Sequence, residues 1–217
     1  MTRILRTLAL PTALAATVAL SACGTGSSPD GHDRSDMSGT TTAAPTASGS
    51  ATSAAGTKNA ADVAFATGMI LHHAQAIAMA DMALTQATSA KVMALAPKIK
   101  AAQGPEIARM SGWLVGWGAP VPDTTGGHDM SAMGGQGDEM MSAQEMTDLG
   151  MATGSTFDRM WLQLMVQHHE GAVAMARTEL AQGANPEGKE LAQSIIDSQT
   201  VEIAEMSSIL TEIPGQS

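Results

Sequence analysis

The pattern of apolar and polar positions predicts an all-α protein whose long helices form two hairpins. Apolar residues recur every three or four positions in four stretches, which is the spacing of helices with one buried face. The predicted helices run from about 59 to 87, 89 to 117, 156 to 182 and 186 to 211. Gly183 followed by Asn185-Pro186 marks a helix end and the next start. A short helix is expected from 142 to about 149, because Ser142 and Glu145 match a capping box.

Two proline-containing sites interrupt the second predicted helix. Pro97 and Gly104-Pro105 stand inside an otherwise helical pattern. Proline lacks the backbone donor that a helix interior needs, and its ring clashes with the preceding turn. We therefore expect a kink or a break there.

The chain contains an internal duplication. Residues 69–80 and 165–176 both read Met-x-x-His-His-x-x-Ala-(Ile/Val)-Ala-Met-Ala, and the first histidine of each is His72 or His168, 96 residues apart. The same offset relates further positions over about fifty residues without a gap, a pattern typical of a repeat architecture. Two duplicated helical hairpins indicate a four-helix bundle.

The duplicated segments place polar side chains on the apolar faces of the helices. Within each predicted hairpin, a turn centred near residue 89 or 185 brings His72 level with Glu106, and His168 level with Glu202. The second histidine of each pair, His73 or His169, lies on the flank of the same face. An unpaired buried carboxylate costs several kcal/mol, so these glutamates need partners.

Two interpretations of this polar core remain open. It is either a hydrogen-bonded His–Glu pair that fixes helix register, with methionines filling the core, or a metal site. Adjacent histidines with a facing glutamate and nearby methionines, all present twice, favour the metal site. The candidate ligands in the two repeats are His72, His73, Met69, Met79, Glu106, Met110, His168, His169, Met165, Met175, Glu202 and Met206.

A glycine-rich connector between the repeats adds His128, Met130 and Met133 as candidate ligands. These methionines have no apolar face to join, whereas methionines in a helix stripe are usually core residues. Thioether and imidazole together, without thiolate, suit Cu(I), and Cu(II) is also compatible with the His/Glu groups. The alternative is a flexible connector of biased composition.

The N-terminus has the pattern of a lipoprotein signal. Arg3 and Arg6 precede an apolar stretch, 8–20, that is too short for a comfortable membrane span. It ends in Leu-Ser-Ala-Cys, which resembles the bacterial lipoprotein processing box and implies lipidation of Cys23. An ordinary secreted protein with one stray thiol is the alternative. We expect a signal peptide at 1–22 and a lipidated, flexible linker at 23–58.

Charge narrows the possible partners. The formal net charge is −10, and loss of Arg3 and Arg6 with the signal peptide would make it −12. This negative charge argues against nucleic acid as a binding partner and against electrostatic attraction to anionic lipid. The lipid anchor is therefore the only membrane contact that we expect. The remaining domain, 59–217, divides into repeat one (59–118), the connector (119–141) and repeat two (142–212).

The motifs resemble those of the bacterial family called domain of unknown function 305. The resemblance rests on the two His-His-x-x-Ala-x-x-Met-Ala segments, on Gln-x-x-Glu-Ile-x-x-Met after each, and on Met-Met-Ser-x-x-Glu-Met before the second repeat. It covers about 59 to 210. It implies a ferritin-like four-helix bundle that is exported or membrane-anchored, with copper-associated members. By motif, the implied ligands are His72, His73, Met79, His168, His169 and Met175.

We therefore expect an exported protein, lipid-anchored at the outer face of the bacterial cell membrane, that sequesters or delivers copper; the sequence leaves open whether it also catalyses a reaction. A ferritin-like di-iron redox protein is one alternative, although Glu-x-x-His is absent at Glu106 and Glu202. A structural or partner-binding bundle is the other.

The anchor can be tested with Cys23→Ser. We expect this variant to be released into the medium or to remain unprocessed, because the acceptor of the lipid is gone. Fractionation followed by mass determination of the mature N-terminus measures this. Membrane retention of a correctly cleaved Cys23→Ser protein would exclude the lipoprotein interpretation.

Overall fold

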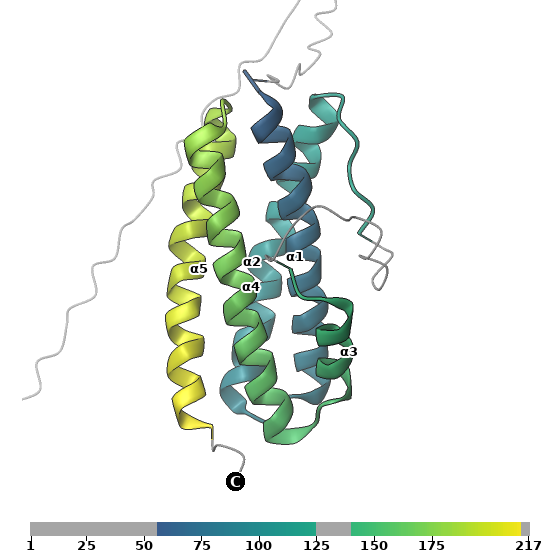
Figure 1. Cartoon of the computed structure of the whole chain (residues 1–217), viewed down its shortest axis with the longest axis vertical. Coiled ribbons are helices and arrows are strands. Elements are labelled where there is room, and N and C mark those ends of the chain that lie inside the picture. Colours follow the sequence, from purple (N-terminus) through teal and green to yellow (C-terminus); the bar gives the residue numbers. More distant parts are fainter. Residues whose placement is uncertain (1–55, 125–139, 214–217) are drawn as a thin grey trace, which may run out of the picture. The chain divides into compact units, whose positions relative to one another are not determined.

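The computed structural model describes residues 56–124 and 140–213, and the regular elements in these residues are helices. Within the two described ranges there are five helices and no strand, which confirms the all-α prediction (Figure 1). They are α1 (Ala60–Gln86), α2 (Ala90–Gly116), α3 (Ala143–Met151), α4 (Gly154–Gln182) and α5 (Pro186–Glu212). Their boundaries lie within about two residues of the predicted ones.

Polar side chains cap three of the helices, including the predicted starts at Ser142 and Asn185. Asn59 accepts hydrogen bonds from Ala61 and Asp62 at the start of α1, and Asn185 accepts one from Gly188 at the start of α5. Ser142 and Glu145 complete the capping box of α3. These side chains satisfy backbone donors that the first turn of a helix leaves without a partner.

Of the kink or break expected in the second helix, the break is wrong. α2 is one continuous helix that contains Pro97 and Pro105. Both prolines are exposed, and so are the residues four positions earlier, Met93 and Ala101. Water can therefore hydrate the carbonyl groups that each proline leaves without a donor, while the opposite face of α2 stays packed in the core.

The long helices pack as two hairpins, α1 with α2 and α4 with α5, which meet through α1 and α4 (Figure 1). The short helix α3 packs beside α4. By length and composition α1 could cross a membrane, but two-thirds of its most apolar stretch (67%) is buried against the other helices, as in the core helix of a soluble protein.

The core consists of two apolar clusters separated by a polar layer. Cluster one is built around Leu95 and Trp161, and cluster two around Phe65 and Leu191. The first half of α1 lies in cluster two, while the first half of α4 lies in cluster one, so α1 and α4 run antiparallel. Every long helix carries polar residues in the stretch between the two clusters. They are His72, His73, Gln103, Glu106, His168, His169, Gln199 and Glu202.

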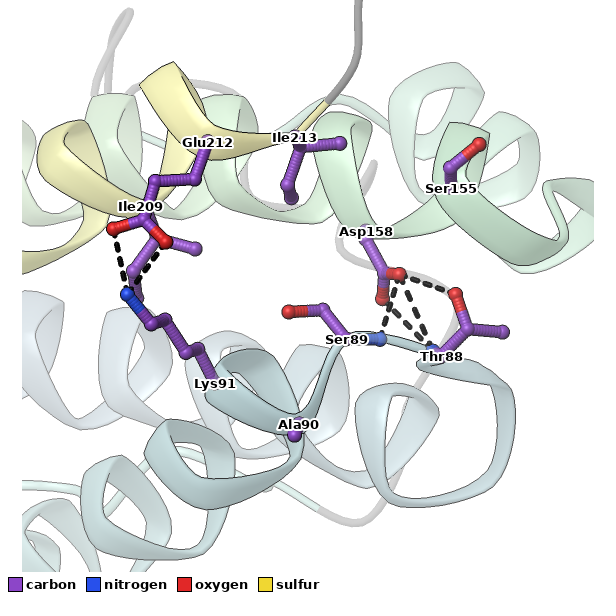
Figure 2. Close-up of a pocket in the computed structure, with 9 residues that line it drawn as sticks. All are labelled: Thr88, Ser89, Ala90, Lys91, Ser155, Asp158, Ile209, Glu212 and Ile213. Atoms are coloured by element: carbon purple, nitrogen blue, oxygen red, sulfur yellow. Dashed lines mark hydrogen bonds and ion pairs between the residues drawn. The ribbon is translucent and has the colours of Figure 1, made fainter.

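An aspartate in each repeat binds the hairpin turn of the other repeat. Asp158 in α4 accepts hydrogen bonds from the backbone N–H groups of Thr88 and Ser89 and from the Thr88 hydroxyl (Figure 2). At the opposite end, Asp62 in α1 accepts from the backbone N–H groups of Ala184 and Asn185. These reciprocal contacts hold the two hairpins together at both ends and fix the level at which α1 crosses α4.

The end at which Asp62 lies has an additional buried acidic residue that the other end lacks, so the two repeats differ there. Glu179, whose counterpart in repeat one is Ala83, is 1% exposed and lies against Asp62. Burial, together with the hydrogen bond and negative charge of Asp62, raises the pKa of Glu179 to about 7. Burial would also raise the pKa of Asp62, but hydrogen bonds from Asn185 and Asn59 hold it below its ordinary value. When ionised, neither carboxylate oxygen of Glu179 has a hydrogen-bond donor.

This pair predicts a pH dependence of stability. The folded-state pKa of Glu179, about 7, lies above the reference value of 4.5, so its contribution is fully present below pH 4.5 and is lost as the pH rises through 7. We expect Glu179→Gln to remove about 1–3 kcal/mol of this pH-dependent loss and to be more stable than the wild type at pH 8.

Urea unfolding at pH 5 and pH 8 measures the effect. Glu190→Gln, which changes an exposed carboxylate of the neighbouring helix, is the matched control and should follow the wild type. If Glu179→Gln keeps the wild-type pH dependence, the pair does not share a proton.

Candidate metal site

The structure brings the four histidines of the duplicated motif into one layer. His72 and His73 come from α1, and His168 and His169 come from α4, and all four are fully buried. Adjacent residues on a helix point about 100° apart. One histidine of each pair therefore faces the other hairpin, and its neighbour faces the second helix of its own hairpin.

His72 and His168 meet where the two hairpins cross. Their ring centroids are 3.6 Å apart, and the ring planes are inclined by 35°. Because these residues are 96 positions apart, which is the offset of the duplication, they occupy equivalent positions in the two repeats. The contact between the hairpins is therefore centred on two imidazole rings.

The other two histidines each bind a glutamate of their own hairpin. His73 Nε2 lies 2.6 Å from Glu106 Oε2, and His169 Nε2 lies 2.7 Å from Glu202 Oε2. The glutamate side chains are 19% and 18% exposed, so they lie at the edge of the core. The expected burial of these carboxylates is thus only partly correct.

The sequence-based pairing of His72 with Glu106, and of His168 with Glu202, is wrong by one residue. The predicted position of the histidine along the helix axis, level with the glutamate, is nearly right, because adjacent residues differ by only about 1.5 Å along that axis. The direction was wrong, since the next residue is rotated by about 100°. The glutamates pair with the second histidine, and the first histidine is left for the other hairpin.

Several polar atoms in the layer are buried without a hydrogen-bond partner. Both ring nitrogens of His168 are among them, as are Nδ1 of His73 and of His169. The side-chain carbonyl oxygens of Gln103 and Gln199 are also buried without a hydrogen-bond partner. Burial, followed by the neighbouring His72, His169 and His73, lowers the pKa of His168 well below its ordinary value. His168 is thus a neutral ring that carries a lone pair.

The candidate methionines pack on both sides of the histidine layer. Met79, Met165 and Met206 belong to cluster one, and Met69 and Met110 belong to cluster two, against which the partly buried Met175 packs. No three His, Cys, Asp or Glu side chains within 56–124 and 140–213 are arranged around one point as ligands of an ion. His128, Met130, Met133 and Cys23 lie outside the described residues.

The chain is similar to known proteins over a range that includes the residues of this layer. The family described as a domain of unknown function, DUF305, matches the chain over residues 62–210. The chain belongs to the DUF305 family. This range includes both His-His pairs and both glutamates.

Solved structures extend the comparison. A DUF305 protein from Streptomyces coelicolor, predicted to be secreted, is 31% identical over 72% of this chain and 98% of its own, with a TM-score of 0.62. A DUF305 fragment from Deinococcus radiodurans is 30% identical over 72% and 99%, also with a TM-score of 0.62. CopM in its Cu(II)-bound form is 34% identical over 70% and 96%, with a TM-score of 0.59. No curated protein matches the chain.

Two polar anchors of this DUF305 chain were missed in the sequence. The Gln75 amide exchanges two 2.8 Å hydrogen bonds with the backbone of Met141 and so ties the start of the α3 segment to α1. The Trp161 indole N–H donates to the Met79 carbonyl oxygen across the α1–α4 contact. The only available signal for Gln75 was a departure from the repeat, because Gly171 stands at the equivalent position.

The unpartnered ring of His168 predicts how the metal-free protein responds to replacement. Leucine has a similar size and needs no hydrogen bond. We expect His168→Leu to raise the free energy of unfolding by roughly 1 kcal/mol, because a buried polar group without a partner is removed. Urea unfolding in the presence of a chelator measures this.

His169→Leu is the matched comparison within the same helix. It removes the partner of Glu202, so we expect a loss of roughly 1–2 kcal/mol. A loss of several kcal/mol in His168→Leu would instead show that His168 holds the hairpins in register.

Proposed function

We propose that this chain is an exported copper-binding protein that sequesters or delivers copper, and that the histidine layer between the two hairpins is a copper site. The observation that carries the proposal is the set of buried ring nitrogens without hydrogen-bond partners in His73, His168 and His169. Such groups cost stability in a structural core. A metal ion that accepts the lone pairs of these nitrogens accounts for their being buried without hydrogen-bond partners.

The donor set fits copper. Neutral imidazole binds Cu(II) and Cu(I), and thioether sulfur favours Cu(I). The layer supplies imidazoles from both hairpins, and methionines pack directly above and below it. The His72 and His168 rings, which contact each other with their planes inclined by 35°, would have to turn for both to bind one ion. We infer that copper binding rearranges side chains at the crossing of α1 and α4.

The relatives support this choice of metal. CopM is known in Cu(II)-bound and Cu(I)-bound forms and in a silver-bound form, at 32–34% identity to this chain. Silver(I) is a soft ion that resembles Cu(I) in its ligands. The similarity spans both repeats, because it covers about 70% of the chain.

The place of the protein in the cell is a further part of the proposal. Removal of residues 1–22 and lipidation of Cys23 would tether the helical domain to the outer face of the membrane through the 23–58 linker. The related Streptomyces coelicolor protein, predicted to be secreted, supports export. We also propose that the two hairpins form a ferritin-like four-helix bundle, with the 119–141 connector as a second, Met- and His-containing copper site.

Copper titration of the purified protein, with elemental analysis, tests the proposal. A ligand at a hundredfold excess over its Kd stabilises the folded state by about 2.7 kcal/mol. We therefore expect copper to raise the melting temperature of the wild type and to leave the double variant His72→Leu/His168→Leu unchanged. Equal copper-induced shifts in both proteins would exclude the site at the crossing.

Deletion of 126–137 is the control, because it removes His128, Met130 and Met133 but leaves the helices intact. We expect it to bind less copper in total while keeping the wild-type shift in melting temperature. Iron in place of copper would favour the di-iron alternative. Absence of any metal uptake would favour a structural or partner-binding role.

A further inference from the structure

We propose that Glu106 and Glu202 are positioning residues: they hold His73 and His169 in the tautomer that carries its proton on Nε2, so that Nδ1 is the nitrogen that binds copper. This inference rests on the proposed function and specifies its site. It also changes the role expected for the two glutamates, from metal ligands to residues that act through the histidine rings.

The first argument is that both repeats make the same contact. His73 Nε2–Glu106 Oε2 and His169 Nε2–Glu202 Oε2 measure 2.6 and 2.7 Å, and each pair is separated by 33 residues along the chain. Two nitrogen and oxygen atoms this close need a proton between them. The duplicated geometry therefore places a proton on the Nε2 side of each ring.

The second argument is the state of the other nitrogen. Nδ1 of His73 and Nδ1 of His169 are buried and have no hydrogen-bond partner. A proton on Nδ1 would be a buried donor without an acceptor, which costs more than an unused lone pair on a neutral ring. A ring that donates from Nε2 to the glutamate oxygen avoids this cost, and its lone pair is then on Nδ1.

The third argument is the position of the carboxylates. Both rings are fully buried, whereas the glutamates are 19% and 18% exposed. The glutamates therefore lie where water reaches them, and the oxygen of each that contacts a histidine is Oε2. A carboxylate that hydrogen-bonds the far nitrogen of a metal-binding histidine fixes its tautomer and orientation and increases its basicity.

Nitrogen-15 NMR of the metal-free wild-type protein tests the tautomer directly. Long-range correlations between ring nitrogens and ring protons distinguish a protonated Nε2 from a protonated Nδ1. We expect His73 and His169 both to carry the proton on Nε2. A proton on Nδ1 in either ring would overturn the assignment, and this measurement needs neither a variant nor copper.

Copper affinity of glutamate variants tests the role. In Glu106→Gln/Glu202→Gln the amide carbonyl can still accept the Nε2 proton, whereas Glu106→Ala/Glu202→Ala offers no acceptor. We expect the Gln variant to stay within a few-fold of the wild-type affinity, and the Ala variant to lose about 10–100-fold. Glu205→Ala, which removes an exposed carboxylate from the same helix, is the control and should bind as the wild type does.

The outcomes separate this inference from the proposed function. If the Gln and Ala variants lose affinity equally, the carboxylates are ligands and the inference fails, although the protein still binds copper. If the wild type takes up no copper in the helical layer, the proposed function fails, and the assignment of Nδ1 as a ligand fails with it. An Nε2 proton combined with the Gln/Ala difference supports the inference.

Discussion

The core is arranged around the antiparallel crossing of α1 and α4, where two imidazole rings are buried against each other. His72 and His168 are the same position in two copies of one sequence motif, and their ring centroids lie 3.6 Å apart. Removing imidazole from water is unfavourable unless its nitrogens find partners. Around this contact the polar residues of all four long helices form a single layer, and the apolar core is divided into one cluster on each side.

The free energy that offsets the cost of this polar layer comes from other parts of the fold. Each apolar cluster is continuous across all four long helices, and hydrophobic burial is the main favourable contribution to folding. The hairpins are also linked at both ends by Asp62 and Asp158, each of which receives backbone hydrogen bonds from the turn of the other hairpin. These contacts do not involve the histidines. The crossing can therefore carry buried polar groups, because register is fixed at the two ends.

This division of roles is consistent with a site that takes up and releases a metal ion. The two His–Glu pairs stay within their own hairpins, whereas the His72–His168 contact joins the hairpins. Side chains at the crossing could thus move without breaking the pairs that orient their neighbours. Methionines on both sides of the layer add flexible, polarisable side chains, which accommodate small changes in packing.

In the part of the chain that the structure describes, the sequence alone was enough to predict the approximate helix boundaries, the caps of the α3 and α5 helices and the pairing of helices into hairpins, because these depend on local periodicity and on turn chemistry. The duplication also identified His72, His73, His168 and His169 as equivalent candidate ligands of the two repeats. Only the tertiary structure decided which histidine of each pair faces which helix, since one residue changes the direction by about 100° and the height by only about 1.5 Å. It also decided the roles of Glu179 and Gln75, which have no counterpart in the other repeat and act through contacts with Asp62 and Met141. Such contacts depend on how the hairpins pack, and no local pattern encodes them.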